Sequence, residues 1–395
     1  MKTALCLGSC LLCWLSWLPF IQAEPMPTPI EDQVKAENLV RALGDRSFKV
    51  REQASHDLLL LGRPAFTALQ QGLMDENPEI RARCRRLWPV VFEMDLHARL
   101  EAFLADGEGK QTHDLPGWQR FRKIAGADRQ ARELFAKMVR ADGALMDLAE
   151  NRPEELPPDR LGKRAVELQQ LENNPNLRIP VHAVEYVQLL FLSSNPKIAS
   201  TPIISQQIGS ILYQAKVRAL LTGDEADTMK KVILAWFESQ VDDCPVVIYY
   251  MNNLNMKECL PMALKVARNK NAPPYARSAA LTMVGRMGNK EHVSAIEPMM
   301  ADTTIVATLN VNQRIGAGGV VNNGVPRTIQ VGDVALAMTI HLSGQKPADF
   351  GYEMTRTNSN AVFSYANLGF PDEATRADSR RKWKEWLDKN KEEKK

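Results

Sequence analysis

The chain has 395 residues, of which 45% are apolar and 25% are charged, a composition typical of a globular protein. Its 22 glycines and 23 prolines are too few for a collagen-like or low-complexity chain. Because 50 Lys and Arg residues nearly balance 47 Asp and Glu residues, the net charge of +3 gives no overall attraction to nucleic acid or anionic membranes. Six cysteines are too few for a disulfide framework in a chain of this length.

The first 23 residues have the pattern of a secretory signal peptide. Met1 and Lys2 form a basic start, residues 3–21 are apolar and uncharged, and Ala23 is a small residue at a cleavage point. We therefore expect cleavage after Ala23 and an exported protein, in the periplasm, in the cell envelope or secreted. An uncleaved anchor is an alternative, because the run approaches the ~20 residues of a membrane helix. Residues 7–10 resemble a lipoprotein box, which is a second alternative.

The predicted mature chain begins with a proline-rich tether, residues 24–30. It keeps three cysteines, Cys84, Cys244 and Cys259, and an odd number cannot pair fully within one chain. Two interpretations stay open. An oxidising compartment permits a Cys244–Cys259 bridge, and burial as three small apolar side chains is the alternative that we favour.

The clearest local pattern is a helical hairpin near the N-terminus. Residues 47–62 place apolar side chains at helical spacing, and Gly62 stands where a helix ends. Pro64 opens a second helix, over residues 65–74, with Phe66, Leu69 and Leu73 directed inward. The face of the first helix that we expect to be buried consists of Val50, Ala54, Leu58 and Leu61.

This pattern recurs along the chain. Ile80-Arg81 follows Val50-Arg51 by thirty residues, and both arginines have an aspartate six positions earlier, Asp75 and Asp45. Residues 276–288 reproduce residues 50–62, with Ala276, Ala280, Val284 and Met287 at the offsets of the apolar positions and Arg277 at that of Arg51. A weaker copy over residues 331–342 has Gly332 where the arginine should stand. A hairpin this short cannot bury its own apolar face, so it must stack on another.

The repeated pattern V-R-x-x-A, followed by L-x-x-L-G and a second amphipathic helix, resembles HEAT repeats, whose hairpins stack into an α-solenoid. The downstream part, residues 276–302 and 329–352, is similar to exported HEAT-like proteins of planctomycete-type bacteria. The resemblance implies an Asp/Arg ladder along the stack, but Gly332 and Asn271, six residues before Arg277, depart from that pattern. These are packing residues, so they indicate a fold rather than a function.

The remaining regions divide around these repeats. The middle, residues 109–269, is helical without a clear period, and either a divergent repeat stack or a separate irregular domain fits it. Residues 304–331 break the helical pattern with β-rich stretches and an Asn-Gly turn signal, which predicts a small β flap. Residues 376–395 form a predicted capping helix with Trp383 and Trp386 on one face and a charged tail. The predicted domains are therefore 31–108, 109–269, 270–375 and 376–395.

Motifs for chemistry are scarce. The six histidines are too far apart for a zinc helix, and no G-x-S-x-G elbow is present. Residues 107–112 resemble a phosphate-binding loop but lack its first glycine and its Ser/Thr, and 316–319 lack the third glycine of a dinucleotide loop. We expect no metal, no cofactor and no catalytic residue. The arginines of residues 81–86 are diluted by acidic neighbours, so we expect no nucleic-acid partner.

The fold class expected from these patterns is all-α, an α-solenoid of HEAT-like hairpins with an irregular helical middle and a β flap. Two functions remain in view: an exported, non-enzymatic scaffold that binds a protein or cell-envelope component, and a secreted hydrolase-like enzyme with its site in the middle region. Exposed loops on a rigid scaffold often carry recognition, so the flap is the candidate contact. Its candidate partner-binding residues are Val320, Val321, Asn323 and Gly324.

Overall fold

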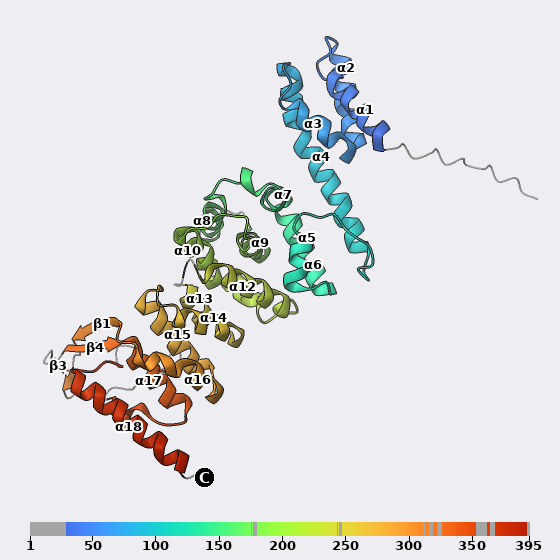
Figure 1. The fold of residues 1–395 in the computed structure, drawn as a ribbon. Coiled ribbons are helices and arrows are strands. Elements are labelled where there is room, and N and C mark those ends of the chain that lie inside the picture. The colour runs from blue at the N-terminus through green and yellow to red at the C-terminus, as the bar shows by residue number, and fades with distance from the viewer. Residues whose placement is uncertain are drawn as a thin grey trace, which may run out of the picture. The chain divides into compact units, whose positions relative to one another are not determined.

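The computed structural model describes residues 29–174, 176, 180–242, 244, 247–310, 313–315, 319–321, 326–352, 362–363 and 368–392. The expected signal peptide, residues 1–23, lies outside this part of the chain. The described residues are mostly helical, as expected, with small antiparallel sheets near the C-terminus (Figure 1). The chain divides into two compact units, Met1–Asp95 and Leu96–Lys395. None of the described helices combines the length and apolar character that crossing a membrane requires.

The first unit contains the predicted hairpin. Gly62, at a φ of +66°, ends the first hairpin helix because a residue without Cβ adopts this backbone at little cost. Pro64 opens a short 3₁₀ turn before the second helix, and Pro78 stands at the first position of a long helix that continues past Asp95. The helices are α1 (Pro29–Ala42), α2 (Phe48–Leu61), α3 (Phe66–Gly72) and α4 (Pro78–Ala105).

Four residues were expected to form the buried face of α2, and two of them are fully buried. Ala54 and Leu58 are buried, and Leu61 is half-buried against the same cluster. Val50 was expected to be buried but is 40% exposed. Its counterpart Ile80 packs beside Gly44 and is 6% exposed, because the helices before α4 supply a surface for it. Among the described residues only α1 precedes α2, which leaves the first turn of α2 without such cover.

The middle of the second unit consists of packed helices. Its most deeply buried helix is α9 (Ala183–Ser193), in which every residue from Tyr186 to Ser193 is buried. It packs against the neighbouring α6, α8 and α12. The other helices are α5 (Trp118–Ala125), α6 (Arg129–Ala141), α7 (Gly143–Asn151), α8 (Arg160–Asn173), α10 (Pro202–Ser210), α11 (Ala215–Leu220), α12 (Ala226–Gln240), α13 (Ile248–Leu254) and α14 (Leu260–Arg268).

The C-terminal part of this unit holds the downstream repeat. In α15 (Pro274–Met287) the predicted face is confirmed, since Ala276, Ala280, Val284 and Met287 are all buried. This helix packs between α14 and α17. The remaining elements are α16 (Val293–Ile296), β1 (Ile305–Asn310), β2 (Gln313–Ile315), β3 (Gly319–Val321), β4 (Pro326–Gln330), α17 (Val331–Leu342) and α18 (Glu373–Glu392).

The predicted flap is two antiparallel ribbons, β1–β4 and β2–β3. In the longer one Thr308 stands opposite Thr328 and Leu309 opposite Arg327, with a bulge between Ile305 and Ala307. On its other side β4 is bridged by Phe370 through Thr328. The two segments that form the longer ribbon lie beside α17 and α18 (Figure 1).

The three described cysteines form no disulfide with one another. All three are buried, and Cys84 and Cys259 are free thiols, so the Cys244–Cys259 bridge is not formed. Burial raises the pKa of Cys84 to about 11 and that of Cys259 to about 12. Such thiols stay protonated and behave as small apolar side chains.

Candidate functional site: the base of the flap

Polar groups gather where the flap joins the helices. The first group centres on Asp302, at the entry to β1. Its carboxylate accepts the Thr304 N–H at 2.9 Å and the Arg277 Nη2 at 2.5 Å, and its carbonyl accepts the Gly332 N–H at 2.8 Å. A Cβ on Gly332 would lie 2.5 Å from the Met300 carbonyl oxygen, so the close approach of α17 needs glycine. The entry and the exit of the flap therefore meet at one turn.

The second group is a buried ion pair under β4. Asp333, in the first turn of α17, is 1% exposed, and Arg376 of α18 is 4% exposed. Their Oδ1 and Nε atoms lie 2.9 Å apart. The other oxygen of Asp333 accepts the Gln330 N–H at 2.8 Å, which caps α17. The buried Tyr352 hydroxyl donates to the Asp333 carbonyl at 2.7 Å.

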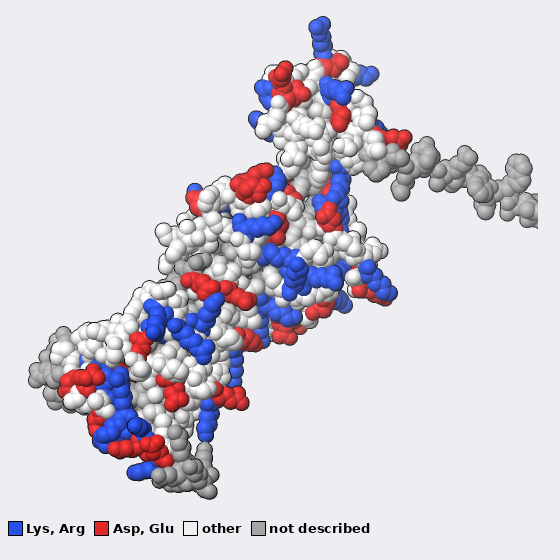
Figure 2. All heavy atoms as spheres, in the orientation of Figure 1, with Lys and Arg blue, Asp and Glu red and all other residues white. Residues whose placement is uncertain are grey.

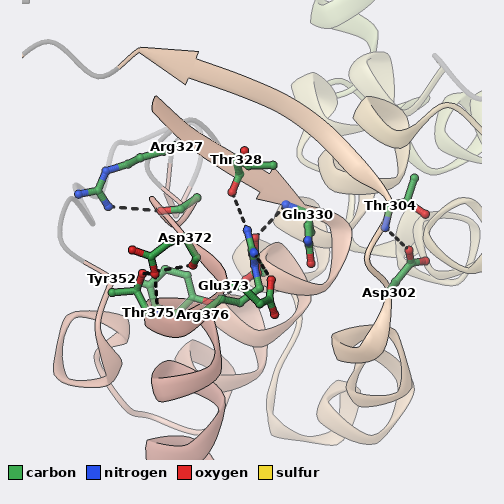
Figure 3. Close-up of polar contacts among 12 residues, drawn as sticks. Asp302, Thr304, Arg327, Thr328, Gln330, Tyr352, Asp372, Glu373, Thr375 and Arg376 are labelled. Carbon is green, nitrogen blue, oxygen red and sulfur yellow. Dashed lines mark hydrogen bonds and ion pairs between the residues drawn. The ribbon is translucent and has the colours of Figure 1, made fainter. Parts of the chain in front are cut away.

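Arg376 also reaches the strand itself. Its Nη2 donates to the Thr328 carbonyl at 3.0 Å, and its Nη1 pairs with Glu373 at 2.5 Å. Figure 3 shows this side chain rising from α18 toward Thr328 and Gln330. Thr328 in turn exchanges two backbone hydrogen bonds with Phe370. One guanidinium thus ties α18, α17 and β4 together. We call Thr328, Gln330, Asp333, Tyr352 and Arg376 the flap clamp.

The charge states of Asp333 and Tyr352 in the flap clamp are consistent with a role in holding β4 in place. Burial raises the pKa of Asp333, and the hydrogen bond from Arg376 acts in the opposite direction. Burial, reinforced by the nearby Asp333 charge, raises the pKa of Tyr352 well above its usual value, so its hydroxyl is a neutral donor. A buried pair with both partners hydrogen-bonded fixes orientation, and removing either partner leaves a charge uncompensated. This arrangement holds the strand in place.

The candidate partner-binding residues lie farther out on the flap. Val320 and Val321 belong to β3, where they face Arg314 and Gln313 of β2 in the ladder. Asn323 and Gly324 lie outside the described residues. The residues predicted from the sequence do not include Asp333 or Arg376 of the flap clamp. The sequence could have indicated Asp333, because it stands three positions after Gln330 as in a capping box. No local pattern indicates Arg376.

The region of the alternative enzyme contains a cavity of about 610 Å³ beside α6, α9 and α12. Its two carboxylates are already engaged: Glu225 pairs with Lys137 at 2.5 Å, and Glu185 pairs with Arg164 at 3.1 Å. The side chain of His182 is exposed at its rim. Within the described residues no three His, Cys, Asp or Glu side chains are grouped as metal ligands.

Residues 107–112, which resemble a phosphate-binding loop, are held by a carboxylate of the protein itself. After α4 the carboxylate of Asp106 accepts the N–H groups of Lys110 and Gln111, at 3.1 and 2.9 Å, and lies 2.9 Å from His113 Nε2. The backbone donors that could cradle a phosphate are thus satisfied by a side chain of the protein. The His113 hydrogen bond is the largest cause that lowers the pKa of Asp106 to about 2.

The surface charge is mixed. On the face drawn in Figure 2, basic and acidic side chains of the second unit alternate without a continuous stripe of one sign. The chain matches no family model, no curated protein and no solved structure.

Proposed function

We propose that the protein is an exported, non-enzymatic HEAT-like scaffold that binds a protein or cell-envelope component through its flap, residues 304–331. The flap clamp is the observation that carries this proposal. The base of the β ribbon is held by the buried Asp333–Arg376 ion pair and by three further hydrogen bonds. Rigid anchoring lowers the ordering cost of a recognition element.

The repeat character of the proposed solenoid has local support in the first unit. Arg51 Nη1 donates to the carbonyl of Asp45 at 2.8 Å, and Arg81 Nη1 donates to that of Asp75 at 2.6 Å. The aspartate carboxylates cap the N–H groups two residues on, at 2.7 and 2.8 Å. The same spacing therefore makes the same turn-to-helix contact twice.

The downstream copy does not repeat this contact. Arg277 donates instead to the Ala267 carbonyl and to the carboxylate of Asp302. The proposed stack therefore differs at α15, beside the flap. There Arg277 binds Asp302 at the flap entry, whereas Arg51 and Arg81 bind the turn that precedes their own helix.

The test is capture of an envelope component by the immobilised protein. Deleting Gly316 to Gly324, or combining Val320→Asp with Val321→Asp, should weaken capture while the thermal midpoint changes little. Ile203→Asp is the matched control, because Ile203 is an exposed apolar residue of α10, at 69% exposure, outside the flap. That variant should capture like the wild type.

Two results contradict the proposal. Unaltered capture by both flap variants removes the flap from the binding surface. Turnover in a broad hydrolase screen, lost on changing residues of the cavity beside α6 such as Lys137 or His182, replaces the scaffold with the enzyme alternative.

A further inference from the structure

The outer edge of β1 has no strand partner among the described residues. Thr328 donates its N–H to the Phe370 carbonyl at 3.0 Å and accepts the Phe370 N–H at 3.1 Å. Both backbone groups of Thr328 therefore face away from β1. In an antiparallel ladder the residue opposite such a position also turns its N–H and C=O outward. Since Thr308 stands opposite Thr328, its backbone groups face the far edge of β1.

In the described part of the chain no second strand pairs with this edge, and the helix that contacts β1 is α15. Among these residues β1 pairs with β4 alone, and the other side of β4 is closed by Phe370. The strand, Ile305–Asn310, carries no charge and no proline, and Ile305 is 57% exposed. Edge strands are usually protected by lysine, proline or a covering element. Here a bulge lies at one end, between Ile305 and Ala307, and the rest of the strand is regular.

We propose that this edge pairs with the same edge of a second copy of the chain, antiparallel, with a two-fold axis between the two Thr308 residues. The four-stranded sheet would have the order β4-β1-β1-β4. A two-fold interface needs a surface that complements itself. Thr308 meets this need, because two copies related by the axis exchange their outward N–H and C=O groups.

The side chains fit the same register. Thr308 already lies beside Thr328, with 3.4 Å between their Oγ1 atoms, so the pairing extends a line of threonines across four strands. Thr–Thr pairs stabilise antiparallel neighbours. The flanking pairs are Ala307 with Leu309, one small and one large apolar side chain, and no like charges meet. The proposal does not depend on the binding proposed for residues 320–324.

A cysteine placed at the axis tests the register. Opposed residues of a hydrogen-bonded pair have Cα atoms about 5.5 Å apart, which is within the range of a disulfide. In a full-length background with Cys6, Cys10 and Cys13 changed to serine, Thr308→Cys should form a covalent dimer under mild oxidation. The remaining cysteines, Cys84, Cys244 and Cys259, are buried. Thr303→Cys is the control, because two copies of that residue would lie roughly 30 Å apart in this register.

A charged residue at position 308, on the proposed two-fold axis, tests whether the dimer forms through this edge. The wild type should sediment as a dimer, and Thr308→Lys should shift it to monomer because two lysines would face each other across the axis. Thr303→Lys adds the same charge outside the strand and should remain dimeric. Thr308→Pro provides a second break, since it removes an N–H that faces away from β4. A monomeric wild type at 100-fold the working concentration, a dimer unaffected by Thr308→Lys, or equal crosslinking at both cysteine positions would overturn the proposal.

Discussion

Asp333 and Arg376 are 43 residues apart in the chain, yet their side chains form a 2.9 Å ion pair in which both are almost fully buried. The pair joins the start of α17 to the start of α18 beneath β4. Each partner is also hydrogen-bonded elsewhere, Asp333 to the Gln330 N–H and Arg376 to the Thr328 carbonyl. The anchoring of the flap therefore depends on contacts between segments that are distant in sequence.

Removing Arg376, the cation of this pair, should lower the free energy of unfolding. Arg376→Leu leaves the Asp333 carboxylate buried without its partner, so we expect the free energy of unfolding to fall by about 3–5 kcal/mol. Arg381→Leu is the matched control on the same helix. Its ion pairs with Asp378 and Glu385 are exposed, and their loss should change the free energy of unfolding little. Urea unfolding of both variants checks this, and equal losses would contradict the assigned role of the clamp.

Gly332 should not tolerate a methyl group. In Gly332→Ala the new Cβ would meet the carbonyl oxygens of Met300 and Asp302 at 2.5 and 2.8 Å, and backbone atoms cannot rotate away. We expect a loss of about 1–3 kcal/mol. Gly107→Ala is the control, because no heavy atom lies within 4 Å of its Cβ position. Chemical denaturation compares the two, and an unchanged midpoint for Gly332→Ala would show that α17 and the flap entry are farther apart.

A charge on the buried face of α15 should disrupt the packing of the downstream repeat. Ala280 is fully buried, so Ala280→Asp places an unpaired carboxylate in a helix interface and should cost several kcal/mol. Ala102→Asp, at an exposed position of α4, should cost about 0.7 kcal/mol through helix propensity alone. Thermal midpoints distinguish the two. A small shift for Ala280→Asp would mean that the alignment of residues 276–288 with 50–62 does not define the packed face.

Protonation of Asp106 at low pH should lower the stability of the protein. Its folded pKa of about 2 lies below the usual value of about 3.9 in an unfolded chain. The stabilising contribution of this carboxylate is therefore complete above about pH 4 and is lost as the pH falls through about 2. Asp106→Asn should be less stable than the wild type at neutral pH, and the difference should shrink between pH 4 and 2. Asp224→Asn, at an exposed site, is the control, and a pH-independent difference for Asp106→Asn would contradict the assignment.

Some of the structure could be read from the sequence because its causes are local. The turn from α2 to α3 depends on Gly62 and Pro64, whose backbone preferences act wherever they occur. The buried face of α15 follows from helical spacing within fourteen residues. The contacts of Arg51 and Arg81 repeat because each reaches a carbonyl six residues earlier, within one turn and one helix start.

Other features were decided by the tertiary structure alone. Val50 and Ile80 occupy equivalent positions in the pattern, but Ile80 follows three helices that help to cover it and Val50 follows α1 alone among the described helices. Gly332, a departure from the repeat, is required by the Met300 carbonyl, which the pattern cannot place. Periodicity records which face of an element is apolar. It does not record which distant element meets that face, because burial is decided by the neighbours that the folded chain supplies.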